Sequence, residues 1–167
     1  MAGPVLNVAD ARRFPMAPPG GSERFGATIA KIGEAIGLRQ LGCMLHEVGP
    51  GKRAFPYHNH HGNEEMFVVL EGSGEVRIGT AAHPIRAGDV IACPAGGPET
   101  AHQIVNSGTG PLRYLGISTL HDPEVVEYPE SGKFGVLAIG PGNSFATARL
   151  RFIGRLEGGL DYWDGEG

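Results

Sequence analysis

Cysteine is scarce in this sequence, and its scarcity excludes a fold held together by disulfides. The two cysteines, Cys43 and Cys93, lie far apart and form no CxxC pair. Small secreted domains that depend on disulfides carry several closely spaced cysteine pairs. We therefore interpret both residues as small buried hydrophobic side chains in a protein from a reducing compartment.

Long apolar runs and basic clusters are also missing. No segment approaches the ~18 apolar residues of a membrane-spanning helix, and residues 1–15 lack the basic region and hydrophobic stretch of a secretory signal. The 14 Lys and Arg residues are outnumbered by 18 Asp and Glu residues, and they form no long positive stretch of the kind that binds nucleic acid. We expect a cytoplasmic protein that binds neither membranes nor nucleic acids.

Glycine and proline, in contrast, are abundant. The chain has 28 Gly and 13 Pro in 167 residues, and they separate short apolar runs at intervals of roughly eight to twelve residues, as in a β-sandwich or barrel. A chain of this length suits a single domain with its own core. We predict an all-β domain with strands near 38–48, 53–60, 65–72, 74–79, 82–88, 89–95, 100–106, 112–119, 134–140 and 145–152.

The first part of the chain has weaker signals. Residues 1–24 are rich in Pro and Gly and show no hydrophobic period, which is typical of an arm. In residues 22–37, Ile29, Ile32 and Ile36 recur at helical spacing behind a capping residue, Ser22, but three glycines interrupt the pattern. A short helix and a turn both remain open there.

The segment YHNHHGNEEMFVVLEG, residues 57–72, gathers side chains that bind metals. Because side chains alternate along a strand, His58 and His60 project to one face and His61 points away unless the chain turns first. Glu65 shares its parity with Phe67 and Glu64 does not, so alternation alone leaves the choice of carboxylate open.

A further histidine, His102, begins a strand-like run whose alternation places Ile104 and Asn106 on the same face. Three histidines and one carboxylate inside a barrel would bind a divalent transition metal and leave positions for water or substrate. An isolated histidine is more often a hydrogen-bonded core residue, and we interpret His46, His83 and His121 in this way. A same-face pair beside two carboxylates is costly to bury without a metal.

Two segments resemble the conserved motifs of the cupin superfamily. The first motif, G(X)5HXH(X)3–4E(X)6G, is similar to residues 51–72, with Gly51 one residue further from the histidines than the pattern has it. The second, G(X)5PXG(X)2H(X)3N, is similar to residues 88–106, with five residues in place of two before the histidine. The matching residues are His58, His60, Glu65 and Gly72 in the first motif and Gly88, Pro94, Gly96, His102 and Asn106 in the second.

The resemblance implies a fold and a ligand set. The fold is a double-stranded β-helix, or jelly-roll barrel, formed by residues 38–120, with an N-terminal arm over residues 1–37 and a C-terminal extension over 121–167 that packs on the barrel. The ligands are His58, His60, Glu65 and His102, which would hold one divalent transition metal such as Fe, Mn, Ni or Zn. The choice of Glu65 over Glu64 comes from the resemblance. The chain looks like small single-barrel bacterial cupins, some of which have been labelled sugar-phosphate isomerases.

Such a metal suits a small-molecule enzyme, because an open coordination position can bind a substrate oxygen or O2 or polarise a carbonyl. The neighbours expected on the inner face, Phe67, Val69 and Ile104, are apolar, which favours an oxygenase or a related metal-assisted reaction over phosphosugar isomerisation. Glu99, in the inserted loop before His102, is a candidate acid or base. Sugar-phosphate isomerisation and binding of a small ligand without turnover are the alternatives.

The outward face of residues 66–72 is apolar, and the flanks 1–37 and 121–167 are long enough to reach a second chain. We therefore expect a homodimer.

Overall fold

Strands make up most of the regular structure. The structure is a computed structural model that describes residues 3–140 and 148–167. Its helical elements are the single-turn helix α1 (Ile32–Ile36) and 3-10 turns that include η1 (Val8–Asp10), η2 (Pro98–Thr100) and η4 (Leu156–Gly158). The strands are β1 (Phe14–Met16), β2 (Ala27–Lys31), β3 (Leu41–Val48), β4 (Asn59–His60), β5 (Glu65–Glu71), β6 (Ser73–Ile78), β7 (Ala81–Arg86), β8 (Val90–Cys93), β9 (His102–Val105), β10 (Leu112–Thr119), β11 (Glu124–Tyr128), β12 (Lys133–Ala138) and β13 (Leu150–Gly154).

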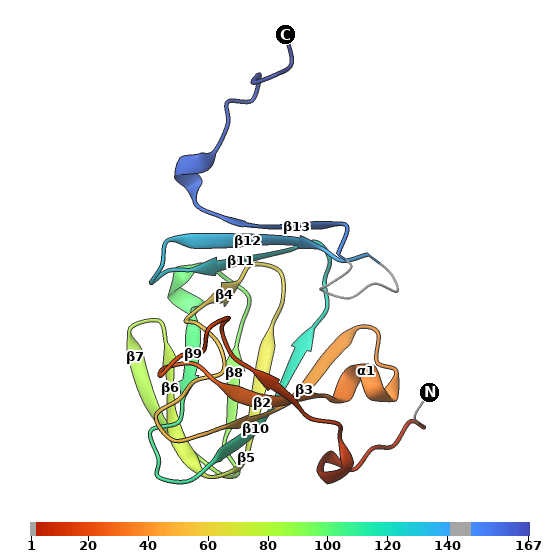
Figure 1. The fold of residues 1–167 in the computed structure, drawn as a ribbon, viewed down its shortest axis with the longest axis vertical. Helices are drawn as coiled ribbons and strands as arrows, with labels where there is room; N and C mark the ends of the chain where they lie inside the picture. Colours follow the sequence, from red (N-terminus) through yellow and green to blue (C-terminus); the bar gives the residue numbers. More distant parts are fainter. Residues whose placement is uncertain (1–2, 141–147) are drawn as a thin grey trace.

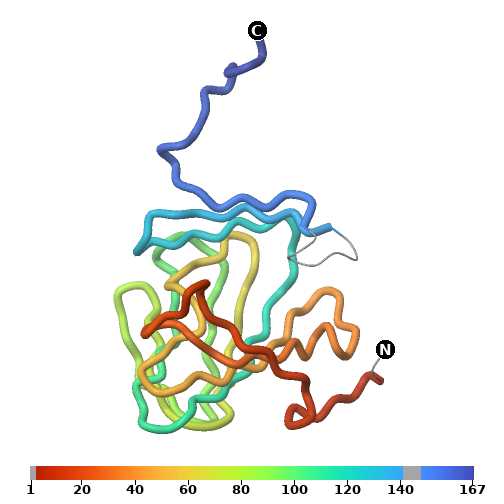
Figure 2. The backbone as a smooth tube through the Cα atoms, viewed as in Figure 1, coloured from red at the N-terminus to blue at the C-terminus, as the bar shows by residue number. Residues whose placement is uncertain are grey.

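The strands form three antiparallel sheets that curve into a jelly-roll barrel. Their orders are β1-β2-β3-β10-β5-β8, β13-β12-β11-β4 and β7-β6-β9. The long pair β3 and β10 is in register from Leu41 opposite Thr119 to Val48 opposite Leu112. Strands β11, β12 and β13 lie across one end of the barrel, and the C-terminal segment leads away from it (Figures 1 and 2). The expectation of an all-β, jelly-roll fold is confirmed.

The main core fills the barrel, because alternate residues of each strand point inward. In β5, for example, Phe67 and Val69 are buried while Met66 and Leu70 are 40% exposed. The buried core residues are Val48, Ala54, Phe67, Val69, Val76, Ile85, Ile91, Cys93, Ile104, Leu112 and Tyr114. A second cluster, Ala11, Ala30, Ile32 and Leu45, joins the N-terminal segment to the outside of β3.

The structure differs from the strand predictions at several places. The ambiguous segment 22–37 contains both a strand, β2, which pairs with β3, and the helix α1, which ends at Gly37 with φ 84°. The segment expected as a strand over 53–60 pairs regularly only at β4, and β11 was not predicted. Of the last predicted strand, 145–152, residues 145–147 lie outside the described residues, and β13 begins at Leu150.

Two motif glycines are required by backbone geometry. Gly72 and Gly88 have φ of 84° and 96°, in the left-handed region that side chains disfavour. A Cβ at Gly72 would also collide with the carbonyl oxygen of Pro111. The motif residue Asn106 is fully buried, and its side-chain amide donates to the carbonyl oxygens of Val48 (2.7 Å) and Gly110 (2.9 Å). These residues shape the turns that connect the barrel strands.

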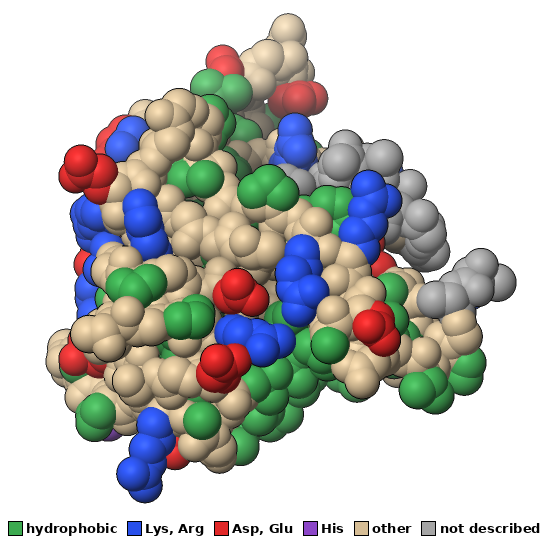
Figure 3. All heavy atoms as spheres, turned by 60° about the horizontal axis from the view of Figure 1, so that its bottom comes forward, with side chains coloured by type: hydrophobic (Ala, Val, Ile, Leu, Met, Phe, Trp, Pro, Cys, Tyr) green, Lys and Arg blue, Asp and Glu red, His purple; other side chains and the backbone are tan. Residues whose placement is uncertain are grey.

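The surface mixes charges of both signs. On the face shown in Figure 3, acidic and basic side chains lie interspersed with hydrophobic ones. Within residues 3–140 and 148–167, no helix is long and apolar enough to cross a membrane.

Candidate metal centre

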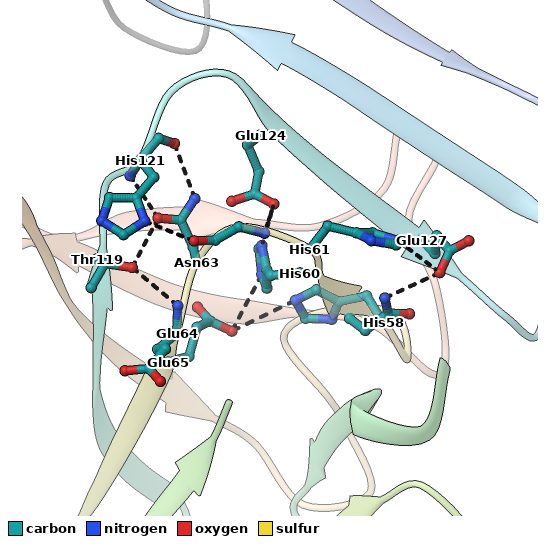
Figure 4. A network of polar contacts seen from close by, with 12 residues as sticks. His58, His60, His61, Asn63, Glu64, Glu65, Thr119, His121, Glu124 and Glu127 are labelled. Carbon is teal, nitrogen blue, oxygen red and sulfur yellow. Dashed lines mark hydrogen bonds and ion pairs between the residues drawn. The ribbon is translucent and has the colours of Figure 1, made fainter. Parts of the chain in front are cut away.

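Four side chains predicted as ligands converge inside the barrel. His58 precedes β4, His60 ends β4, Glu65 begins β5 and His102 begins β9. His58 and His60 lie two residues apart on extended backbone, so both rings face the same way, and Figure 4 shows them directed at the Glu65 carboxylate. Glu65 lies two residues before Phe67 on β5, so the two side chains share the inward face of the strand.

The three histidines meet at a single carboxylate oxygen. Glu65 Oε2 lies 2.9 Å from His102 Nε2, 3.4 Å from His60 Nε2 and 3.8 Å from His58 Nε2. His58, His60 and Glu65 offer ligand atoms within 4.8 Å of one another, a group that could hold a metal ion. The ring centroids of His58 and His102 are 4.8 Å apart.

The opposite ring nitrogens face acceptors of the protein. His58 Nδ1 lies 2.8 Å from the carbonyl oxygen of Pro56, and His102 Nδ1 lies 3.4 Å from that of Thr100. Because a carbonyl only accepts, Nδ1 of His58 carries the proton, and Nε2 of the neutral ring presents a lone pair toward Glu65. The lone pair on His58 Nε2 and an oxygen of the Glu65 carboxylate can therefore both bind a cation placed between them.

Burial and mutual contacts shift the pKa values of these groups. Burial, together with the charge of His102, lowers the pKa of His58 to about 4. Burial alone would lower the pKa of His60, but contacts with Glu65 and Glu124 raise it above its ordinary value. Burial alone would raise the pKa of Glu65, but hydrogen bonds from His102 and His60 hold it well below its usual range. The centre therefore contains an ionised carboxylate near neutral pH.

The donor set fits a divalent transition metal. Imidazole nitrogen and carboxylate oxygen bind such ions at about 2.0–2.2 Å, so ligands that share one ion lie at most about 4.4 Å apart. The three Nε2 atoms lie within that distance of Glu65 Oε2. The ligand atoms of His58, His60 and Glu65 also lie within 4.8 Å of one another, a group that does not include His102. Three neutral imidazoles and one carboxylate would leave net positive charge on a divalent ion.

Aromatic rings surround the ligands. Phe67 lies 5.6 Å from His102, Phe55 lies 6.2 Å from His58, and Tyr128 lies 6.2 Å from His58 in a nearly parallel orientation, all between ring centroids. These contacts agree with the expectation of apolar neighbours, although Phe55 and Tyr128 were not predicted. They give the ligands aromatic neighbours.

His46 forms part of the same aromatic wall. Its ring stacks on Tyr114 with centroids 4.7 Å apart and meets the edge of Phe55 at 5.5 Å. The side chain is 3% exposed, and Nδ1 is buried without a hydrogen-bond partner. Burial lowers the pKa of His46 to about 4. The interpretation of His46 as a core residue is correct, whereas His83 and His121 are exposed.

The remaining candidates lie outside the convergent group. His61 points away from it, as alternation predicts, and its Nε2 lies 3.1 Å from Glu127 Oε2. Glu64 precedes β5, and its side chain is exposed. Glu99 is exposed in η2, and its Oε1 accepts a hydrogen bond from the Gly97 amide at 3.0 Å. A role for Glu99 as an acid or base stays a prediction.

Strand β11 supplies two carboxylates that sequence reasoning missed. Glu124 is buried and its Oε1 lies 3.8 Å from His60 Nδ1, on the side of the ring away from Glu65. Glu127 Oε2 accepts a hydrogen bond from the Asn59 side chain at 3.2 Å. Glu124, Val126 and Tyr128 alternate along the chain, a pattern that indicates a strand with these three side chains on one face. Nothing in the sequence indicated that this strand would pair with the segment that carries the histidines.

Comparison with known proteins supports the family assignment. Residues 44–118 match the family described as the cupin domain. A solved structure of a proposed sugar phosphate isomerase from Acidithiobacillus ferrooxidans is 30% identical, with a TM-score of 0.70 over 81% of this chain and 80% of that one. This chain belongs to the cupin superfamily. Within this cupin, the matched region spans both motifs and all four convergent side chains.

Two further relatives extend the comparison. A sugar phosphate isomerase from a cupin superfamily, from Silicibacter pomeroyi, has 24% identity and a TM-score of 0.75 over 98% of this cupin and 99% of that chain, a likeness of fold. An uncharacterized protein of Methanocaldococcus jannaschii is 34% identical over 74 residues. That match covers 42% of this cupin and 57% of the curated relative's length.

Proposed function

We propose that this cupin is a metal-dependent enzyme that acts on a small molecule, and that His58, His60, Glu65 and His102 hold one divalent transition metal. The observation that carries the proposal is the convergence of three Nε2 atoms on one oxygen of Glu65. The proton on His58 Nδ1, directed to the Pro56 carbonyl, supports it, because that nitrogen arrangement leaves Nε2 free to coordinate.

A bound Fe, Mn, Ni or Zn ion would act as a Lewis acid and offer open positions to substrate or O2. The protein's own residues would supply the surroundings. Phe55, Phe67 and Tyr128 would reduce contact with water and strengthen electrostatic interactions beside the ligands. Such apolar walls suit an aromatic or otherwise largely apolar substrate, so we favour oxygenation or a related metal-assisted reaction.

Sugar-phosphate isomerisation is the second candidate. It is favoured by the 30% identity to the proposed isomerase of Acidithiobacillus ferrooxidans. It is also favoured by Lys133 on β12, the strand that pairs with β11. The Lys133 ammonium group lies 5.4 Å from the centroid of the Tyr128 ring. A lysine at that position could contact a phosphate group. A barrel that binds a small ligand without turnover is the third alternative.

The test is reconstitution of the metal-free protein with Fe(II), Mn(II), Ni(II) and Zn(II) in turn. Each form is assayed with phenolic, keto-acid, thiol and sugar-phosphate compounds for O2 uptake and product formation. Metal-dependent turnover of an apolar substrate, lost in His102→Ala, is the expected result. Interconversion of an aldose and a ketose phosphate would support the isomerase instead. Tight ligand binding without turnover under every metal would contradict both enzymes.

We also propose that the protein is a homodimer. On the outer face of β5, Met66 and Leu70 are each 40% exposed. The C-terminal segment carries Leu160 and Trp163 at 80% and 73% exposure, and it extends away from the barrel (Figure 2). Residues 149–166 also carry charges of both signs in separate places, because Arg149 and Arg155 precede an acidic stretch over residues 157–166. A two-fold arrangement can place the basic part of one copy against the acidic part of the other. Cytoplasmic location stays a prediction.

A further inference from the structure

Glu124 lies directly behind one of the histidines of the candidate metal centre. It begins β11, far along the chain from the cupin motifs, and is 7% exposed. Its Oε1 lies 3.8 Å from Nδ1 of His60 and accepts a hydrogen bond from the Gly62 amide at 3.3 Å. Figure 4 shows the carboxylate on the opposite side of the His60 ring from Glu65.

Both groups contain a buried atom without a partner. His60 Nδ1 and Glu124 Oε2 are each buried and make no hydrogen bond. Burying an imidazole nitrogen or a carboxylate oxygen without a partner costs free energy, so an unsatisfied atom in each of these two neighbouring side chains indicates an interaction that forms in another state of the site. His60 Nδ1 and Glu124 Oε1, now 3.8 Å apart, would form a hydrogen bond if they approached by about 1 Å.

His60 differs from His58 and His102 in the kind of acceptor that faces its Nδ1 atom. His58 and His102 both direct Nδ1 to carbonyl oxygens of the local backbone, Pro56 and Thr100. Nδ1 of His60 faces a charged side chain that belongs to a different part of the chain. A carboxylate behind a metal-bound imidazole fixes the ring's tautomer and orientation and makes it a stronger ligand.

We propose that Glu124 is a positioning residue for the metal centre. Its carboxylate accepts the Nδ1 proton of His60 when metal is bound, so that Nε2 is free to coordinate and points toward Glu65. The C-terminal extension thereby forms part of the centre. This inference rests on the proposed metal-binding function and deepens it.

The same strand provides a matched control. Glu127 is also on β11, and it contacts Asn59 and His61, which neighbour the proposed ligands in sequence without belonging to them. Replacing Glu127 by Gln changes the same charge on the same strand. It leaves the contact behind His60 in place.

The experiment measures metal affinity. Metal-free wild type, Glu124→Gln and Glu127→Gln are titrated with Zn(II) in competition with a chromophoric chelator, and their unfolding is followed without metal. We expect Glu124→Gln to raise the Zn(II) Kd roughly 10- to 100-fold, with Glu127→Gln within about threefold of wild type. An unchanged Kd in Glu124→Gln, or equal losses in both variants, would overturn the role of Glu124.

A second measurement uses the wild type alone, so it does not depend on how the variant folds. Imidazole 15N NMR of the Zn(II)-loaded protein should show His60 coordinated through Nε2, with a hydrogen-bonded proton on Nδ1 that exchanges slowly. A rapidly exchanging Nδ1 proton would overturn the inference while leaving the metal centre intact. Failure of the wild type to bind Zn(II) at all would instead overturn the metal-binding function and this inference with it.

Discussion

His58 and His102 exchange a reciprocal pair of backbone hydrogen bonds. The amide of His102 donates to the His58 carbonyl oxygen at 2.8 Å, and the amide of His58 donates to the His102 carbonyl oxygen at 3.2 Å. This isolated antiparallel bridge holds the segment before β4 against the start of β9. The backbone therefore sets these two histidines side by side without help from their side chains.

Metal removal should therefore lower stability without unfolding the barrel. We expect the wild type to unfold at a higher temperature with saturating metal than without it. At a metal concentration of 100 times the Kd, the free energy of unfolding should rise by about 3 kcal/mol. The metal-free form should keep its far-UV circular dichroism. His102→Ala should lose the metal-dependent increase and retain the spectrum, whereas His83→Ala, at an exposed site on β7, should behave like the wild type. An equal metal-dependent increase in His102→Ala would contradict this.

Acid should destabilise the metal-free protein partly through His46. Burial lowers the pKa of His46 to about 4 in the folded state, against about 6.5 when unfolded. Between these values the unfolded state binds the additional proton, so the free energy of unfolding falls as pH drops from about 6.5 to about 4, by roughly 3 kcal/mol at most. The measurement is urea unfolding across that range.

His46→Leu isolates this contribution, because His58 changes stability in the same direction and remains present in the variant. The loss of stability toward acid should be smaller in His46→Leu than in the wild type. Parallel pH curves for the two proteins would show that His46 does not contribute.

Gly116, on β10, should not tolerate a side chain. A Cβ there would lie 3.0 Å from His46 Cε1 and 3.1 Å from Phe67 Cε1, so both rings would have to move. We expect Gly116→Ala to lower the free energy of unfolding by about 1–3 kcal/mol and to weaken metal binding, because Phe67 packs against His102. Gly49→Ala is the control, since a Cβ there meets nothing within 4 Å. Equal stability of the two variants would contradict the crowding argument.

Self-association should depend on the exposed apolar residues of β5 and the C-terminal segment. Light scattering at micromolar concentration should give about 35 kDa for the wild type, twice the 17.5 kDa of one chain. Met66→Ser and Trp163→Ser should each shift the mass toward that of one chain. A wild-type mass of one chain would mean that these surfaces do not bind a second copy.

The all-β class and the pair His58 and His60 were predictable because their signals are local, whereas the jelly-roll fold and the four-residue ligand set with His102 followed from the family resemblance. Gly and Pro spacing indicated strands, and the pattern around His58 and His60 lies within one short segment. The identity of the carboxylate required the family resemblance, since alternation alone allowed either Glu64 or Glu65. The inward position of Glu65 beside Phe67 agrees with that choice.

The features that were missed depend on pairing between distant segments. β2 forms from a Gly-containing segment because β3 and β1 provide partners on both sides, which overrides its weak local signal. Glu124 reaches His60 because Val126 pairs with His60 across β11 and β4. No spacing within the motifs encodes that register, so the carboxylate behind His60 could not be inferred from the sequence.

The most direct test of the central claim is elemental analysis of protein purified without a histidine tag. Wild type and His83→Ala should each contain about one divalent transition metal per chain. His60→Ala and His102→Ala should contain almost none, because a site that has lost one of its four ligands holds the ion much more weakly. Full metal occupancy in both His60→Ala and His102→Ala would contradict the assignment of the centre.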